Sequence, residues 1–157
     1  RGTEFSNLIN AGCSIVERSI LDSLPTGRFS MEREIFPGIA ESGAMSGLVF
    51  QGYFVDAGTP PSFIQAAREC IQNNRFSTGL REGNNWYGEG AKSQGVVENC
   101  SIGSGVIVSV GARLSDSVIL DGAHIGEGVI LKSCIVARGA KVPANSVLSN
   151  EIIADSR

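Results

Sequence analysis

Residues 99–153 repeat with a period of 17, and this repeat is the strongest constraint on what the chain can fold into. Large aliphatic residues recur in three columns, each with a step of 17: Ile102, Ile119, Val136 and Ile153; Val108, Ile125 and Val142; Leu114, Leu131 and Leu148. The residue two positions before each of them is usually small, as at Cys100, Ala112 and Ser117. Because successive side chains of a strand point to opposite faces, each triplet places a small and a large side chain inward and one outward.

Three triplets in 17 residues predict a coil with three sides made of short parallel strands. Glycines such as Gly105, Gly122 and Gly139 fall between the triplets, where a tight corner needs backbone freedom. This is the hexapeptide repeat, and it resembles the left-handed parallel β-helix family. We expect about three coils, and a fourth if residues 87–97 form an irregular first one. A β-sandwich of short strands is the alternative, but it would not hold a fixed step.

Composition narrows the functions that the chain can have. It has 157 residues, a net charge of −3 and 18 % charged residues, so neither nucleic acid nor an anionic membrane is expected as a partner. No apolar run approaches the roughly 18 residues of a membrane span, and no signal peptide is recognised. A cytoplasmic location is therefore expected.

The cysteines are predicted to be reduced. Cys100 and Cys134 lie two coils apart in one inward column, which places them about 9–10 Å from each other at a coil spacing of about 4.8 Å. A disulfide needs Cα atoms within about 7 Å. There is no C-x-x-C motif, so the sequence carries no zinc signal either.

The N-terminal half shows a mixture of strand and helix patterns. Several elements are expected: strands at residues 8–16, 48–50 and 53–55, a helical turn at 19–24, a helix from Met31 kinked at Pro37, and a helix capped by Thr59 that runs to about Asn73. These elements do not close a sheet with a core of their own. We therefore expect residues 1–73 to be the C-terminal part of a larger α/β domain, residues 74–86 a linker, and residues 87–157 the β-helix.

Three stretches of the N-terminal half resemble a known family. Residues 8–12 (Leu-Ile-Asn-Ala-Gly), 29–37 (Phe-Ser-Met-Glu-Arg-Glu-Ile-Phe-Pro) and 52–60 (Gly-Tyr-Phe-Val-Asp-Ala-Gly-Thr-Pro) look like the C-terminal third of a sugar-1-phosphate nucleotidyltransferase domain. The resemblance is closest to mannose-1-phosphate guanylyltransferases, many of which carry a C-terminal left-handed β-helix. The expected fold class is thus mixed, an α/β remnant followed by a left-handed parallel β-helix.

The resemblance implies an activity and a site. Such enzymes join a nucleoside triphosphate to a sugar 1-phosphate and release pyrophosphate. Asp56 matches one of two metal carboxylates, which implies Mg²⁺, and Asn10 and Gly12 match positions that contact the sugar. From the residues alone, Asp56 can equally close a turn before a helix, and Asn10 can be a turn former. The glycine-rich phosphate loop and the other metal aspartate do not occur here, so we expect an inactive fragment.

Two other classes of function remain open. Hexapeptide β-helices also serve acyltransferases that use a histidine as general base, but the only histidine, His124, is predicted to point outward. The β-helix can also be a non-catalytic assembly module. An outward aliphatic stripe of Val118, Ile135 and Ile152 predicts an interface. A homo-oligomer is the expected use of this stripe, and the alternative is pairing with the chain's own N-terminal part through Phe63 and Ile71.

Overall fold

The computed structural model describes residues 8–76 and 78–154, so the outer ends of the two predicted domains, residues 1–7 and 155–157, lie outside the described residues. The chain divides into two compact units, Arg1–Phe54 and Val55–Arg157. This division differs from the expected boundary at residue 73, because the helix that follows Asp56 packs with the β-helix. Among the described residues, no helix is both long enough and apolar enough to cross a membrane.

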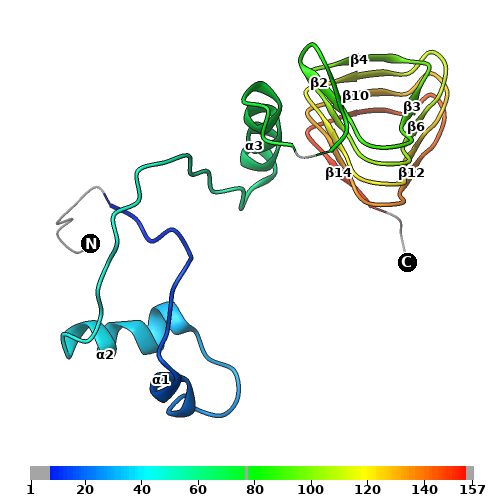
Figure 1. Cartoon of the computed structure of the whole chain (residues 1–157). Helices are drawn as coiled ribbons and strands as arrows, with labels where there is room; N and C mark the ends of the chain where they lie inside the picture. The colour runs from blue at the N-terminus through cyan, green and yellow to red at the C-terminus, as the bar shows by residue number, and fades with distance from the viewer. Residues whose placement is uncertain (1–7, 77, 155–157) are drawn as a thin grey trace. The chain divides into compact units, whose positions relative to one another are not determined.

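The second unit contains a β-helix of short strands stacked in three sheets (Figure 1). Its strands are β1 (Leu80–Glu82), β2 (Asn85–Tyr87), β3 (Lys92–Ser93), β4 (Val96–Glu98), β5 (Ser101–Ile102), β6 (Ile107–Val108), β7 (Arg113–Ser115), β8 (Val118–Ile119), β9 (His124–Ile125), β10 (Ile130–Lys132), β11 (Ile135–Val136), β12 (Lys141–Val142), β13 (Val147–Ser149) and β14 (Ile152–Ile153). The sheets have the orders β1-β2-β5-β8-β11-β14, β4-β7-β10-β13 and β3-β6-β9-β12. The predicted left-handed β-helix of hexapeptide repeats is confirmed.

Neighbouring coils are parallel and keep the predicted register. Leu131, for example, lies opposite Leu114 on one side and Leu148 on the other, a step of 17 in both directions. The irregular first coil is present as well, because β2 and β3 pair with β5 and β6 at a step of 15. The expected linker contains a β-hairpin, in which β1 pairs antiparallel with β2. Residues 80–87 are therefore part of the β-helix sheet system.

The inward columns form the core. The large members that were predicted to be buried have at most 2 % of their surface exposed: Ile102, Val108, Leu114, Ile119, Ile125 and Leu131. The small members near the corners are buried with them, among them Cys100, Ala112 and Ala123. Small residues fit where two sheets meet and large ones fill the middle of each side, which gives the dense packing that protein interiors require.

The three corners need left-handed backbone conformations at a step of 17. Glycine supplies this conformation at Gly105, Gly122 and Gly139, as the sequence predicted. At the corner between the β4-β7-β10-β13 sheet and the β2-β5-β8-β11-β14 sheet, non-glycine residues do so, with φ between 50° and 58°: Asn99, Asp116, Ser133 and Asn150. Short polar side chains are the L-residues that tolerate this region best.

Helix α3 (Pro60–Gln72) lies against the outward face of the β2-β5-β8-β11-β14 sheet (Figure 1). Thr59 and Ser62 form a capping box at its start, with Pro60 in the first turn, as predicted. The buried residues of the helix are Ile64 and Ile71, whereas Phe63 is 37 % exposed. Of the two helix residues expected to face the stripe, Ile71 is thus buried and Phe63 is not, because the sheet decides which side of the helix is covered.

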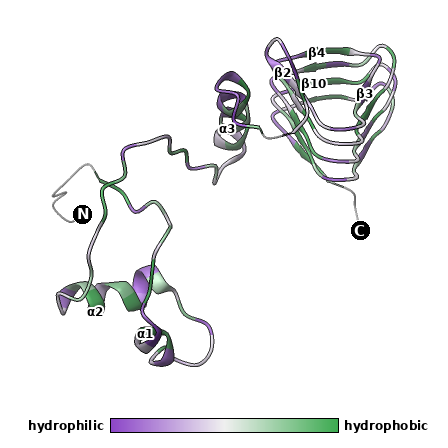
Figure 2. Ribbon diagram, viewed as in Figure 1, coloured by the Kyte–Doolittle hydropathy of each residue, from purple (hydrophilic) through white to green (hydrophobic). Residues whose placement is uncertain are grey.

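The first unit has helices but no strand among the described residues 8–54. It contains α1 (Arg18–Asp22), a π-helical turn η1 (Met31–Ile35) capped by Ser30, and α2 (Phe36–Glu41) with Pro37 in its first turn. The expected strands at residues 8–16, 48–50 and 53–55 are wrong, since these segments are extended without any ladder partner. Figure 2 shows hydrophobic residues along α2 and the adjoining chain, yet no side chain of residues 8–54 is buried.

Replacing Leu131 by alanine tests the inward columns. Leu131 is 1 % exposed, so Leu131→Ala leaves a cavity and should lower the free energy of unfolding by about 2–5 kcal/mol. The neighbouring Ile130 points outward and is 43 % exposed, so Ile130→Ala is the matched control with an expected loss of about 0.5 kcal/mol or less. Urea denaturation of both variants measures the difference. Equal losses would contradict the assignment of inward and outward faces.

Candidate functional site

Asn10 and Gly12, the predicted sugar-contacting residues, form a local turn in the first unit. The backbone N–H of Gly12 donates to Asn10 Oδ1 at 2.9 Å, and Asn10 Nδ2 donates to Glu32 Oε1 at 3.3 Å. Gly12 has φ of +73°, with no atom near the place of a Cβ, so its backbone conformation is what calls for glycine. Glu32, at a helix start where a solvent-facing role was expected, is brought by η1 to the amide of Asn10.

Asp56 lies in the second unit, directly before α3. Its Oδ1 accepts the backbone N–H of Gly58 at 3.0 Å, so it closes a turn that leads into the capping box at Thr59. The expected strand before Asp56 is absent, and Asp56 instead belongs to the approach to a helix. The structure thus places Asn10 with Gly12, and Asp56 separately in the other unit.

For the predicted magnesium site, the described structure offers the exposed carboxylate of Asp56. No group of three or more potential ligands among His, Cys, Asp and Glu occurs within the described ranges. Mg²⁺ is commonly held by one or two carboxylates together with substrate phosphates and water, so a single exposed carboxylate is a sufficient contribution from this chain. The hydrogen bond from Gly58 gives that carboxylate a preferred orientation.

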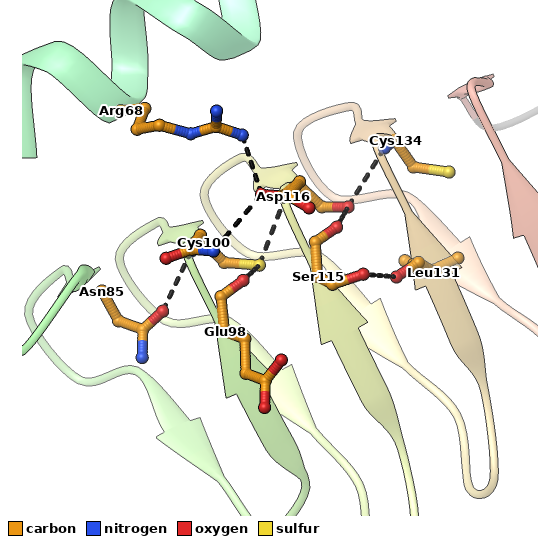
Figure 3. Close-up of polar contacts among 10 residues, drawn as sticks. Arg68, Asn85, Glu98, Cys100, Ser115, Asp116, Leu131 and Cys134 are labelled. Carbon is orange, nitrogen blue, oxygen red and sulfur yellow. Dashed lines mark hydrogen bonds and ion pairs between the residues drawn. The ribbon is translucent and has the colours of Figure 1, made fainter.

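An ion pair joins α3 to the corner of the β-helix (Figure 3). Arg68 Nη2 donates to Asp116 Oδ1 at 2.7 Å, and the two side chains are 34 % and 29 % exposed. Asn99 Nδ2, one coil earlier, donates to the same Asp116 oxygen at 3.4 Å. Arg68 and Asp116 are 48 positions apart in the sequence, and no sequence pattern predicted their contact.

Helix α3 covers part of the predicted interface stripe. Val118 is 4 % and Ile135 is 9 % exposed, because Ile64 and Ala67 of α3 pack on them. Ile152 is 61 % exposed. The helix of the same chain therefore covers two of the three residues, as in the alternative that paired the stripe with the N-terminal part. Ile64 replaces the expected Phe63 in that contact.

Hydrogen bonds between successive coils run along the corner that carries the ion pair of Arg68 and Asp116 (Figure 3). The N–H of Ser117 donates to Cys100 Sγ at 3.3 Å, and the N–H of Cys134 donates to Ser117 Oγ at 3.0 Å. The Cys100 thiol in turn donates to the Glu98 carbonyl at 3.1 Å. All four cysteines are free thiols, in line with the predicted reduced state.

Burial determines the acidity of Cys100. Loss of hydration raises the pKa of its thiol from 9.0 to about 11, although its hydrogen bonds with Ser117 and Glu98 act in the opposite direction. At neutral pH the thiol is therefore protonated, and a buried protonated thiol is a poor nucleophile. Cys100 is a structural residue of the corner.

His124 lies on the outward side of β9 and is exposed, as predicted. Its partners in register are Ile107 and Lys141 on the neighbouring strands. Within the part of the chain that the structure describes, no carboxylate is hydrogen-bonded to the imidazole. This position does not favour a histidine base for acyl transfer.

The comparisons with known proteins agree with this architecture. Residues 88–157 match the family described as GlmU-like, C-terminal hexapeptide. The second part of the chain is therefore similar to hexapeptide-repeat domains of this type.

Relatives match along most of the chain, and they are mannose-1-phosphate guanylyltransferases. The chain is 33 % identical to the enzyme of Mycobacterium tuberculosis over 144 residues, covering 89 % of this chain and 36 % of that protein. It is 31 % identical to probable mannose-1-phosphate guanylyltransferase 3 of Oryza sativa subsp. japonica, covering 94 % and 39 %. For the catalytic subunit beta of Danio rerio the identity is 35 %, with 87 % and 41 % covered. The resemblance read from the sequence is confirmed, and the chain spans about two fifths of the length of these relatives.

The raised pKa of Cys100 predicts a pH dependence of stability. Between pH 9 and 11 the unfolded chain releases the thiol proton while the folded chain keeps it, so this contribution to stability is complete below pH 9 and is lost as the pH rises through 11. The loss should be on the order of 1–3 kcal/mol. Urea denaturation at pH 8 and pH 10.5 measures it.

Cys100→Ser is the matched control for this titration. Serine occupies the equivalent buried position one coil later, at Ser117, and does not titrate in this range. The variant should therefore lose less stability than the parent on going from pH 8 to pH 10.5. Parallel losses in the two proteins would show that Cys100 does not carry the effect.

Proposed function

We propose that this chain is the C-terminal part of a sugar-1-phosphate nucleotidyltransferase of the mannose-1-phosphate guanylyltransferase type. The observation that carries the proposal is the extent of the similarity, which covers 89 % to 94 % of the chain in the first two relatives. The hexapeptide match alone covers residues 88–157, less than half of the chain. The similarity therefore extends well beyond the β-helix and over Asp56, which a β-helix found in many proteins would not explain.

The reaction joins two phosphate groups. An oxygen of the sugar 1-phosphate attacks the α-phosphorus of a nucleoside triphosphate, the bond to the β-phosphate oxygen breaks, and pyrophosphate leaves with that oxygen. Positioning and charge neutralisation dominate the catalysis of such transfers. In the complete enzyme, Asn10 and Gly12 contact the sugar, and Asp56 contributes one carboxylate to hold Mg²⁺. When bound, this ion neutralises negative charge on the phosphates.

The first unit supports the proposal by what it leaves exposed. Leu48 is 96 %, Phe50 is 71 % and Ile15 is fully exposed, and such side chains need a covering surface. An α/β nucleotidyltransferase domain would bury them and give the extended segments at residues 8–16 and 48–55 their ladder partners. The chain by itself is expected to be inactive.

The complete enzyme is proposed to be a cytoplasmic homo-oligomer. An exposed apolar residue of the predicted stripe supports an assembly surface, with Ile152 at 61 % exposure. Because α3 covers Val118 and Ile135, Ile152 is the member of the predicted stripe that is left for a second copy.

Replacing Asp56 tests the metal role. In the complete enzyme, Asp56→Ala should lower kcat at least about a hundredfold, because the variant loses a group that holds charge-neutralising Mg²⁺ at the transition state. Pyrophosphate release from a panel of nucleoside triphosphates with mannose 1-phosphate measures kcat and identifies the base. Asp121→Asn, a surface change on the β-helix, is the control and should keep full activity. Normal turnover of Asp56→Ala would remove this residue from the metal site.

A charge at position 152 tests assembly. Ile152→Glu should dissociate an oligomer that buries this side chain, because an unpaired charge in an apolar contact is strongly destabilising. Sedimentation velocity distinguishes the species. Val147→Glu places the same charge on the exposed face of another sheet and serves as control. If Ile152→Glu sediments as the parent does, Ile152 is not part of a contact between copies.

A further inference from the structure

The surface on which α3 lies repeats with the coil. On the outward side of the β2-β5-β8-β11-β14 sheet, Val118, Ile135 and Ile152 are in register on successive strands. Each is a β-branched aliphatic residue, and each lies one coil, about 4.8 Å, from the next. Apolar contact is non-directional. The aliphatic contacts of Ile64 and Ala67 alone therefore do not distinguish the observed position of α3 from a position shifted by one coil.

The ion pair between Arg68 and Asp116 breaks this equivalence. Asp116 occupies one corner position in a column whose other members, at a step of 17, are Asn99, Ser133 and Asn150. Asp116 is the one carboxylate of the column. A helix shifted by one coil would place Arg68 beside an amide or a hydroxyl group and would leave Asp116 half-buried without its cation. Breaking a partly buried charge pair in this way is costly.

A hydrogen-bonded path connects this ion pair to Asp56. Asp56 accepts from Gly58, the capping box of Thr59 and Ser62 follows, and α3 continues without a break to Arg68. At a rise of 1.5 Å per residue, Thr59 and Arg68 are separated by about 14 Å of helix. A slip of α3 by one coil would thus carry the start of the helix, and Asp56 with it, by about 4.8 Å.

We propose that Arg68 and Asp116 fix the register of α3 on the β-helix and thereby act as positioning residues for Asp56. The positioning role rests on the proposed nucleotidyl transfer, whereas the register itself does not. A displacement of about 1 Å at a catalytic group can lower a rate a hundredfold, so a selected register matters to turnover. The β-helix then serves as the rigid reference against which the metal-binding segment is placed.

Moving the carboxylate by one coil tests the register directly. The double variant Asp116→Ser with Ser133→Asp exchanges the two side chains between equivalent corner positions, both of which have φ near +50°. Nitroxide labels at Gln65→Cys on α3 and Val147→Cys on β13 report the distance by pulsed electron resonance in the 157-residue chain. Cys13 and Cys70 are replaced by serine, while Cys100 and Cys134 are buried and remain.

If α3 follows the carboxylate toward β13, the distance between the labels should shorten by up to about 4.8 Å. If α3 loses its single preferred position, the distance distribution should broaden. Arg138→Met is the matched control. It breaks the exposed ion pair with Asp121 without changing the corner column of Asp116, and should leave the distance unchanged. A distribution identical to that of the parent after the exchange would overturn the proposed register role.

Turnover in the complete enzyme tests the positioning role. Arg68→Met should lower kcat at least about tenfold with little change in KM, Arg68→Lys should recover part of the loss, and Arg138→Met should have no effect. Normal kcat in Arg68→Met would overturn the positioning role. If the parent enzyme itself transfers no nucleotidyl group to any sugar 1-phosphate, the proposed function fails, while the distance measurement still decides the register.

Discussion

The hydrogen bonds between successive coils are the constraint on which the second unit depends. The N–H of Val118 donates to the carbonyl of Cys134, and the N–H of Ile135 donates to that of Glu151. These partners lie one coil apart, so an inserted residue in a strand would turn the following inward side chains outward. The buried columns, the left-handed corners and the place of Asp116 all follow from this spacing.

The two units differ in what holds their conformation. All buried side chains of the described residues belong to the second unit, beginning with Ile64. The first unit has exposed polar contacts instead, such as the cap of Ser30 on Arg33, the turn of Asn10 with Gly12 and the bond from Asn10 to Glu32. Of the predicted site residues, Asp56 is attached to the packed unit through α3, and Asn10 and Gly12 belong to a segment without a core.

The β-helix could be predicted from the sequence because one rule places every side chain from residue 99 to 153. The strands predicted at 48–50 and 53–55 are absent, because a strand forms only against a partner, and apolar character alone does not supply one. The hairpin of β1 and β2 did carry a signal, a two-residue Gly83-Asn84 turn, which was overlooked. The contact of Arg68 with Asp116 carried no sequence signal, because two residues far apart in the chain leave no local pattern.

The hairpin at the start of the β-helix has a consequence for solubility. A repetitive coil offers unpaired backbone groups at its ends, and these can template another chain. Strand β1 closes one edge of its sheet in the antiparallel sense, so it breaks the repeat that an incoming copy would have to continue. It is only three residues long and carries Arg81 and Glu82, the kind of short charged edge that resists further pairing. This sheet of the β-helix is thereby protected at that edge from pairing with another chain.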